Sequence, residues 1–172
     1  MQDKPAYENY PVSEEEMCKR YKRWMEVLAW YVIMAYDTGK EVGGEKYVEL
    51  LKEKFHTMGQ KSAKMWMALS DSKPEDMADC MGIPKLQDCM DDTFANFWNG
   101  YIETTPKAFE KEVYTCPIVG IWSKQPELCE ILLGASMCGM MEKLNPKFKP
   151  KGFSKLLVKG DKTCRFRVEM EG

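Results

Sequence analysis

The spacing of apolar residues changes character about halfway along this 172-residue chain. Up to about residue 92 they recur every three or four positions, most clearly over 14–36, which predicts amphipathic helices. Segments 94–102 and 108–116 instead read as strands. A single long helical pattern, 125–143, then separates them from a predicted final hairpin of 153–159 and 163–170. Helices first and strands later predict an α+β fold, an antiparallel sheet of about four strands with helices packed on one face.

Glycines divide the predicted helical half. We expect the first helix to cover 14–36 and to end at Asp37-Thr38-Gly39. Gly43-Gly44 then breaks the chain, and a second helix begins near Glu45. Gly59 lies inside that second pattern, where an interior glycine costs about 1 kcal/mol relative to alanine. Close contact between two helices is the simplest reason for a glycine there.

Composition is that of one soluble globular domain spanning 1–172, with 44% hydrophobic and 30% charged residues. We divide it into an N-terminal arm (1–12), a mainly helical part (13–92) and a part with strands and one long helix (93–172). The net charge of −2 is made of scattered charges, which gives no indication of nucleic-acid binding. The longest apolar run, 27–36, is about half of the ~20 residues that a membrane span needs. Without a targeting segment, we expect a cytoplasmic protein.

Seven cysteines are many for a chain of this length. Because the number is odd and no secretory signal precedes them, free thiols are favoured over disulfides. No C-x-x-C pair occurs and His56 is the only histidine, so we expect no metal and no cofactor. His56 could act as a general base, or it could be a half-buried surface histidine.

Cys116-Pro117 stands where a predicted strand gives way to a helical pattern. Pro117 disfavours the helical conformation at Cys116, which places the thiol at a corner where side chains often face a cleft. Trp122 follows in the next short turn or helix. Two more cysteines have recognisable settings, in Leu128-Cys129 and in Gly160-Asp161-Lys162-Thr163-Cys164-Arg165-Phe166. Each of these thiols could also be ordinary core packing.

These motifs resemble the L-2-amino-thiazoline-4-carboxylic acid hydrolase family. The matching features are Cys116-Pro117, Leu128-Cys129, Asn145-Pro146 closing the long helix, and Gly160-Asp161 followed by Cys164 and Phe166. The resemblance covers about 40–170 and is strongest over 113–168. The ending from Gly160 is also similar to 4-vinyl reductase-type small-ligand-binding domains, and distantly to subunits of TRAPP-type transport complexes. Those domains imply an α+β fold with a hydrophobic cavity.

The resemblance implies hydrolysis of a small cyclic C–N/C–S substrate, with Cys116 as the nucleophile. His56, Asp161 and Glu127 are the candidate acid–base partners. Cys129, Cys164 and Trp122 would contact the substrate, whose carboxylate would pair with Arg165 or, alternatively, with one of Arg167 and Lys155.

Two other functions stay open. One is a non-enzymatic ligand-binding or regulatory domain with an apolar cavity rich in methionine and tryptophan. The other is a thiol protein that responds to redox state or metal. The expected partner is a small-molecule substrate or ligand, with no nucleic acid and no membrane. A homo-oligomer is plausible because Met-rich domains can associate through an exposed apolar helix.

Overall fold

The computed structural model describes residues 13–94 and 98–171, so the predicted arm (1–12) lies outside the described residues. It confirms the α+β fold, with one long N-terminal helix and a four-stranded antiparallel sheet. The helices are α1 (Glu14–Leu69), α2 (Ile83–Phe94), α3 (Val119–Trp122) and α4 (Ala135–Leu144), the last preceded by the π-helical segment η4 (Cys129–Gly134). Three 3-10 turns are η2 (Pro74–Ala78), η3 (Cys80–Gly82) and η5 (Leu157–Lys159). The strands are β1 (Asn99–Thr104), β2 (Ala108–Val113), β3 (Phe148–Lys155) and β4 (Cys164–Met170).

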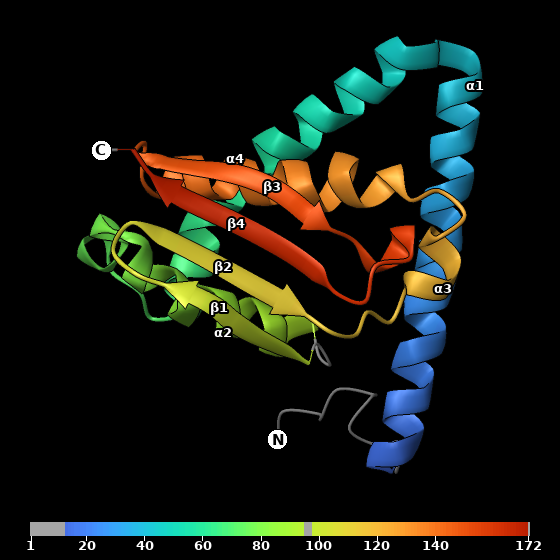
Figure 1. Cartoon of the computed structure of the whole chain (residues 1–172). Helices are drawn as coiled ribbons and strands as arrows, with labels where there is room; N and C mark the ends of the chain where they lie inside the picture. The colour runs from blue at the N-terminus through green and yellow to red at the C-terminus, as the bar shows by residue number, and fades with distance from the viewer. Residues whose placement is uncertain (1–12, 95–97, 172) are drawn as a thin grey trace, which may run out of the picture.

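The sheet has the order β1-β2-β4-β3, and every neighbouring pair is antiparallel. Helices cover one face, while the other face carries no helix in the described part of the chain (Figure 1). On β4, Phe166 and Val168 are buried beneath the helices, and Arg165 and Arg167 project from the opposite face. The sheet therefore separates an apolar side from a charged side.

Helix α1 bends at Gly44, the residue with φ 56° and ψ −147°. The break predicted at Gly43-Gly44 is confirmed, but the predicted helix end at 37–39 is wrong. Gly39 continues the helix because its bare Cα accommodates the Tyr47 ring of the second half, 2.1 Å from where a Cβ would stand. The two halves of α1 meet at an angle beyond the edge of the sheet (Figure 1).

Two strand boundaries also differ from prediction. The segment 94–102 was expected to be extended throughout, but α2 continues to Phe94 and β1 begins at Asn99. Residues 147–152 were expected to form a connector, and most of them belong to β3. Pro150 is tolerated there because β3 is an edge strand, and the register shifts between Pro150 and Gly152.

Two apolar clusters fill the helix-covered side. The first lies between α1, α3, η4 and η5, and includes Tyr36, Trp122, Leu128 and Cys129. The second lies between α1, α2, α4 and the sheet, and includes Trp66, Leu86, Phe109, Met141 and Val168. The first cluster sits at the end of the sheet where β2 leaves for α3 (Figure 1), which is the corner that the cysteines mark.

A buried ion pair lies between α2 and the sheet. Lys111 lies on the same face of β2 as Phe109, is only 3% exposed, and pairs with Asp91 on α2. Asp91 also accepts from the Asn99 side chain at 3.0 Å. The lysine in the apolar register of β2 is thus satisfied by a carboxylate from the helix that covers it.

Candidate functional site

Three cysteines from separate segments converge on the first apolar cluster. Cys116 follows β2, Cys129 begins η4, and Cys164 begins β4. They lie close enough together for the charge of one thiolate to raise the pKa of another. Cys164 raises the pKa of Cys116 in this way, and both raise the pKa of Cys129. Cys129 is buried, whereas Cys116 and Cys164 are half-buried. We call these three residues the thiol corner, and its two half-buried members, Cys116 and Cys164, the rim.

Short polar contacts fix the segments that build this corner. The indole N–H of Trp122 donates to the Ala29 carbonyl at 3.3 Å and ties α3 to α1. The backbone N–H of Leu157 donates to the Cys164 sulfur at 3.2 Å. The Asp161 carboxylate accepts from the backbone N–H of Leu156 at 2.8 Å, so it closes the turn after η5.

Burial disfavours the thiolate form of all three cysteines. It raises the pKa of Cys129 to about 12 and raises the pKa values of Cys116 and Cys164 as well. Backbone hydrogen bonds from Ile118 and Val119 act in the opposite direction on the Cys116 pKa without reversing it. A buried thiol with a raised pKa is a soft apolar group rather than a ready nucleophile.

A polar network borders the same cluster. The Glu127 carboxylate accepts from the buried Tyr36 hydroxyl at 3.3 Å and from the Lys40 ammonium at 3.4 Å. Burial raises the Tyr36 pKa. Glu127 was one of the three predicted acid–base candidates, and it immediately precedes Leu128 and Cys129. Of those three candidates, it is the one joined to the apolar cluster through a buried tyrosine.

His56 lies elsewhere. Its Nε2 stands 3.0 Å from a Glu142 carboxylate oxygen on α4. It lines a groove of ≈ 630 Å³ between the second half of α1 and α4, together with Cys138 and Lys52. Among the described residues, no hydrogen bond or ion pair joins His56 to Cys116, and Cys116 does not line this groove. His56 therefore lies beside Cys138, and not beside Cys116.

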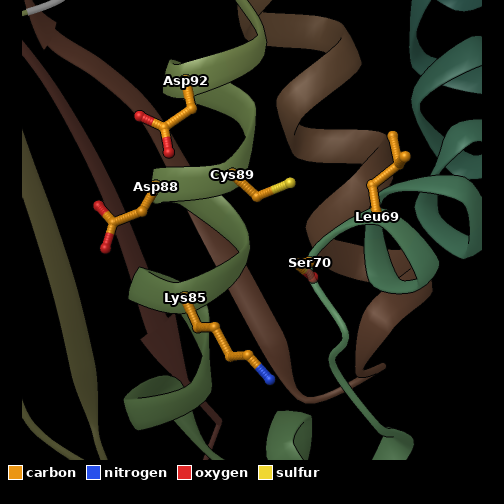
Figure 2. A pocket seen from close by; sticks show the side chains of 6 residues that line it. All are labelled: Leu69, Ser70, Lys85, Asp88, Cys89 and Asp92. Atoms are coloured by element: carbon orange, nitrogen blue, oxygen red, sulfur yellow. The ribbon is translucent and has the colours of Figure 1, made fainter.

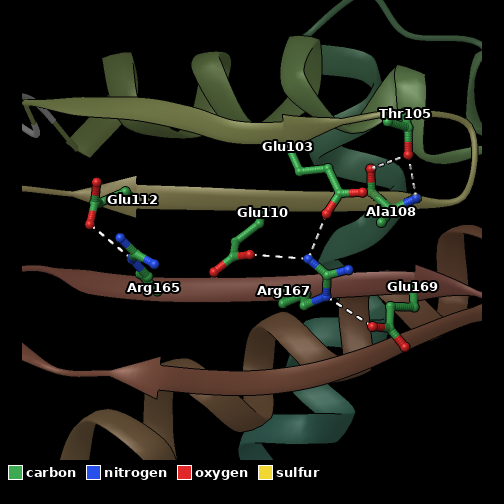
Figure 3. A network of polar contacts seen from close by, with 8 residues as sticks. All are labelled: Glu103, Thr105, Ala108, Glu110, Glu112, Arg165, Arg167 and Glu169. Atoms are coloured by element: carbon green, nitrogen blue, oxygen red, sulfur yellow. Dashed lines mark hydrogen bonds and ion pairs between the residues drawn. The ribbon is translucent and has the colours of Figure 1, made fainter.

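Arg165 points away from the thiol corner. It pairs with Glu112 at 2.9 Å on the helix-free face of the sheet, where Figure 3 shows it beside the Arg167 network. Because neighbouring residues of a strand face opposite sides, Cys164 and Arg165 cannot line one pocket on the covered side. The cation whose charge reaches Cys129 is Lys159, itself paired with Glu130 at 3.0 Å.

A second hollow, of ≈ 550 Å³, lies between the end of α1 and α2. Figure 2 shows Cys89 and Lys85 directed toward Leu69 and Ser70 across it, with the Asp88 and Asp92 carboxylates on the other side of α2. None of the predicted site residues lines this hollow.

Sequence reasoning found the cysteines but missed Tyr36, Lys40 and Lys159. Tyr36 and Lys40 are four residues apart on one helical face, which is a detectable signal. Their common partner Glu127 is 91 residues from Tyr36, and no local pattern joins them. Within the described residues, no group of three or more histidine, cysteine or acidic side chains is arranged to hold a metal ion.

A family model for L-2-amino-thiazoline-4-carboxylic acid hydrolase matches residues 22–168. The chain belongs to this family. The match includes the three cysteines, Glu127, and most of α1. No curated protein sequence matches the chain significantly. None of the described helices has both the length and the apolar character of a membrane span.

Two solved structures share the fold. One is a trafficking protein particle complex subunit 3 from Naegleria fowleri, covalently bound to palmitic acid, with TM-score 0.67, 10% identity, and coverage of 90% of this chain and 97% of that one. The other is the phenol-responsive sensory domain of the transcription activator PoxR with phenol, with TM-score 0.58, 10% identity, and coverage of 83% and 73%. At 10% identity, the comparison shows only that this chain shares their fold.

Proposed function

We propose that this member of the hydrolase family binds a small, mainly apolar organic molecule against the thiol corner. The observation that carries the proposal is the convergence of Cys116, Cys129 and Cys164 on one apolar cluster, with burial raising all three thiol pKa values. Protonated thiols are soft, weakly polar groups that suit aromatic or alkyl ligands. The half-buried rim residues Cys116 and Cys164 offer the route of approach.

The structural neighbours support this choice of ligand class. One carries palmitic acid and the other phenol, so the same fold accommodates an alkyl chain and an aromatic ring in two distant proteins. Phenol and palmitate are therefore suitable probes. A probe seated at the corner would lie next to Cys116 and Cys164 and far from Cys18, which is exposed on α1.

Alkylation with peptide mapping tests the proposal. We expect phenol or palmitate to slow the alkylation of Cys116 and Cys164 while leaving that of Cys18 unchanged. Filling the corner with Cys116→Leu should weaken probe affinity by about tenfold or more, equivalent to about 1.4 kcal/mol. Cys18→Leu is the matched control and should bind normally. If neither probe protects either rim thiol, the corner is not the binding site.

Hydrolysis by Cys116 is a second candidate, favoured by the family match and by the backbone hydrogen bonds from Ile118 and Val119. The Cys116 thiolate would attack the ring carbon between sulfur and nitrogen, and the ring C–S bond would break to leave an S-linked isothiourea. Water would then add to that carbon and release the Cys116 thiol and N-carbamoyl-cysteine. Two of the predicted acid–base partners lie beside the cluster: Glu127, paired with Tyr36 and Lys40, and Asp161, whose charge acts on Cys164.

The product distinguishes this candidate. Mass spectrometry should detect N-carbamoyl-cysteine formed from L-2-amino-thiazoline-4-carboxylate by the unmodified protein and by Cys18→Ser, but not by Cys116→Ser. Glu127→Gln should slow turnover much more than His56→Gln. Full turnover by Cys116→Ser would exclude the cysteine mechanism.

A further inference from the structure

The first half of α1 exposes a row of large apolar side chains. Its inward side carries Ala29, Ile33 and Tyr36, which are buried in the first cluster. The outward side carries large apolar side chains that are each between 38% and 62% exposed. This outer stripe consists of Met17, Trp24, Val27, Leu28, Tyr31 and Met34.

The outer stripe follows from helix geometry. Residues three, four and seven apart lie on one side of a helix, so Trp24, Leu28 and Tyr31 form a single row. Met17 lies two turns before Trp24 on the same side, with Arg20 between them. In Figure 1 this part of α1 runs past the ends of the strands, at the margin of the described structure. The adjacent Trp30 is partly covered, because the Lys124 ammonium lies 4.2 Å from its ring centroid.

The size of the stripe matches a protein interface. From their exposed fractions, the six side chains present on the order of 700 Å², close to the ~800 Å² that each partner buries in a standard interface. Contiguous apolar patches on soluble monomers seldom exceed ~600 Å². Trp and Tyr, which occupy the centre of the stripe, are also the residues most enriched among interface hot spots.

The charges along α1 favour one relative direction for two packed copies of this helix. Just before the centre of the stripe lie the basic residues Lys19, Arg20, Lys22 and Arg23, of which Lys19 and Arg20 pair with Glu15 and Glu16 on the same helix. The segment 24–36 contains a single charge, Glu26. Two parallel copies would bring the two basic runs together, which is unfavourable. Two antiparallel copies related by a two-fold axis between Val27 and Leu28 would place each basic run (19–23) against the uncharged segment 32–36 of the other copy.

We propose that α1 is the dimer interface of this protein, with the outer stripes of two copies packed antiparallel. In this arrangement Trp24 of one copy packs on Tyr31 of the other. The interface is isologous and closes with two copies. Neither the thiol corner nor its ligand takes part in the argument, so the dimer and the proposed binding function stand or fall separately.

Mass measurement tests the dimer. We expect the full chain to sediment as a dimer in analytical ultracentrifugation, and Trp24→Glu and Tyr31→Glu to be monomers with the circular dichroism spectrum of the unmodified protein. Met65→Glu is the matched control, because Met65 is a similarly exposed apolar residue on the second half of α1. It should remain dimeric. A monomeric unmodified protein, or a dimer that survives both glutamate substitutions, overturns the proposal.

Crosslinking tests the direction without relying on destabilising substitutions. In a Cys18→Ser background, an oxidised mixture of Trp24→Cys and Tyr31→Cys proteins should form the mixed disulfide dimer in preference to either self-linked dimer. Preferential self-linking at residue 24 or at residue 31 would indicate parallel helices and overturn the antiparallel arrangement.

Discussion

The backbones of α1 and α4 touch at Gly59 and Ser136. A Cβ atom added to Gly59 would lie 1.9 Å from the Ser136 carbonyl oxygen, which is far inside van der Waals contact. One turn further along, a Cβ on Gly139 would lie 2.1 Å from the His56 carbonyl oxygen. Two glycines, one from each helix, therefore set the distance at which the helices pack. They also hold His56 and Cys138 at the shared groove.

We predict that Gly59→Ala and Gly139→Ala each destabilise the protein by about 1–3 kcal/mol, because the new methyl group forces two backbones apart. Gly120→Ala, which meets no atom within 4 Å, should change stability by no more than about 1 kcal/mol. Urea denaturation measures all three. Equal stability of Gly59→Ala and Gly120→Ala would contradict the close contact.

Sequence reasoning was reliable for glycines whose missing side chain is needed for a close contact or a positive φ. The helix-contact role expected for Gly59 is confirmed, and so is the break at Gly43-Gly44, where Gly44 takes a positive φ. It was wrong at 37–39, because the Tyr47 ring that packs on Gly39 comes from the other half of the helix. It was also wrong at 147–152, because the edge position that makes Pro150 acceptable depends on the order of the strands.

The candidate site was predictable only in part. Cys116, Cys129 and Cys164 could be singled out from local motifs, and the fold brings them together. The network of Tyr36, Lys40 and Glu127 could not be found, since its members meet only when α1 packs against the segment before η4. Successive residues of a strand point to opposite faces of the sheet, so Arg165 lies on the face opposite to its neighbour Cys164.

The buried pair of Lys111 and Asp91 gives a second prediction. Burial lowers the pKa of Lys111 and raises that of Asp91, so each charge depends on the other. Asp91→Ala leaves the lysine without its partner and should cost about 3–5 kcal/mol, whereas the double variant Asp91→Leu/Lys111→Met should cost less than that. A double-mutant cycle in urea measures the coupling.

The exposed pair Lys149–Glu171, 3.0 Å apart, is the control for that cycle. Substituting either of its partners should change stability by about 1 kcal/mol or less. If Asp91→Ala is equally mild, Lys111 has found another partner or reaches water.

The third prediction concerns alkaline pH. An unfolded chain restores the Cys129 pKa to about 9.0, while the native thiol holds its proton up to about 12. Between these values the native state binds more protons, so its stability falls as pH rises, by at most about 1.4 kcal/mol per pH unit for this thiol. Below pH 9 both states are protonated and the contribution is constant.

Denaturation from pH 8 to pH 11 isolates the effect. Cys129→Ala should lose stability less steeply than the unmodified protein above pH 9, and Cys18→Ala should keep the original slope. Identical slopes for all three proteins would show that the native Cys129 thiol ionises as readily as the unfolded one.

The last prediction concerns Arg167, whose guanidinium joins three carboxylates on the helix-free face of the sheet (Figure 3). Its nitrogens lie 2.7 Å from Glu103, 3.0 Å from Glu110 and 2.9 Å from Glu169. Arg167→Gln removes this cation from Glu103 and Glu110, while Glu169 keeps Lys151 at 3.2 Å, and should cost about 1–2 kcal/mol at low ionic strength. Arg167→Lys should recover only part of that loss, because an ammonium cannot reproduce the planar fork.

Salt separates charge from packing at this position. Raising the ionic strength from 0.01 M to 1 M shortens the Debye length from about 30 Å to about 3 Å, so the loss in Arg167→Gln should shrink markedly in urea titrations at high salt. Arg20→Gln, which removes an exposed pair with Glu16 within α1, should change stability by about 0.5 kcal/mol or less in either condition. If the loss of stability in Arg167→Gln does not depend on salt, the arginine stabilises the sheet through packing of its aliphatic stem. Its charge would then contribute little.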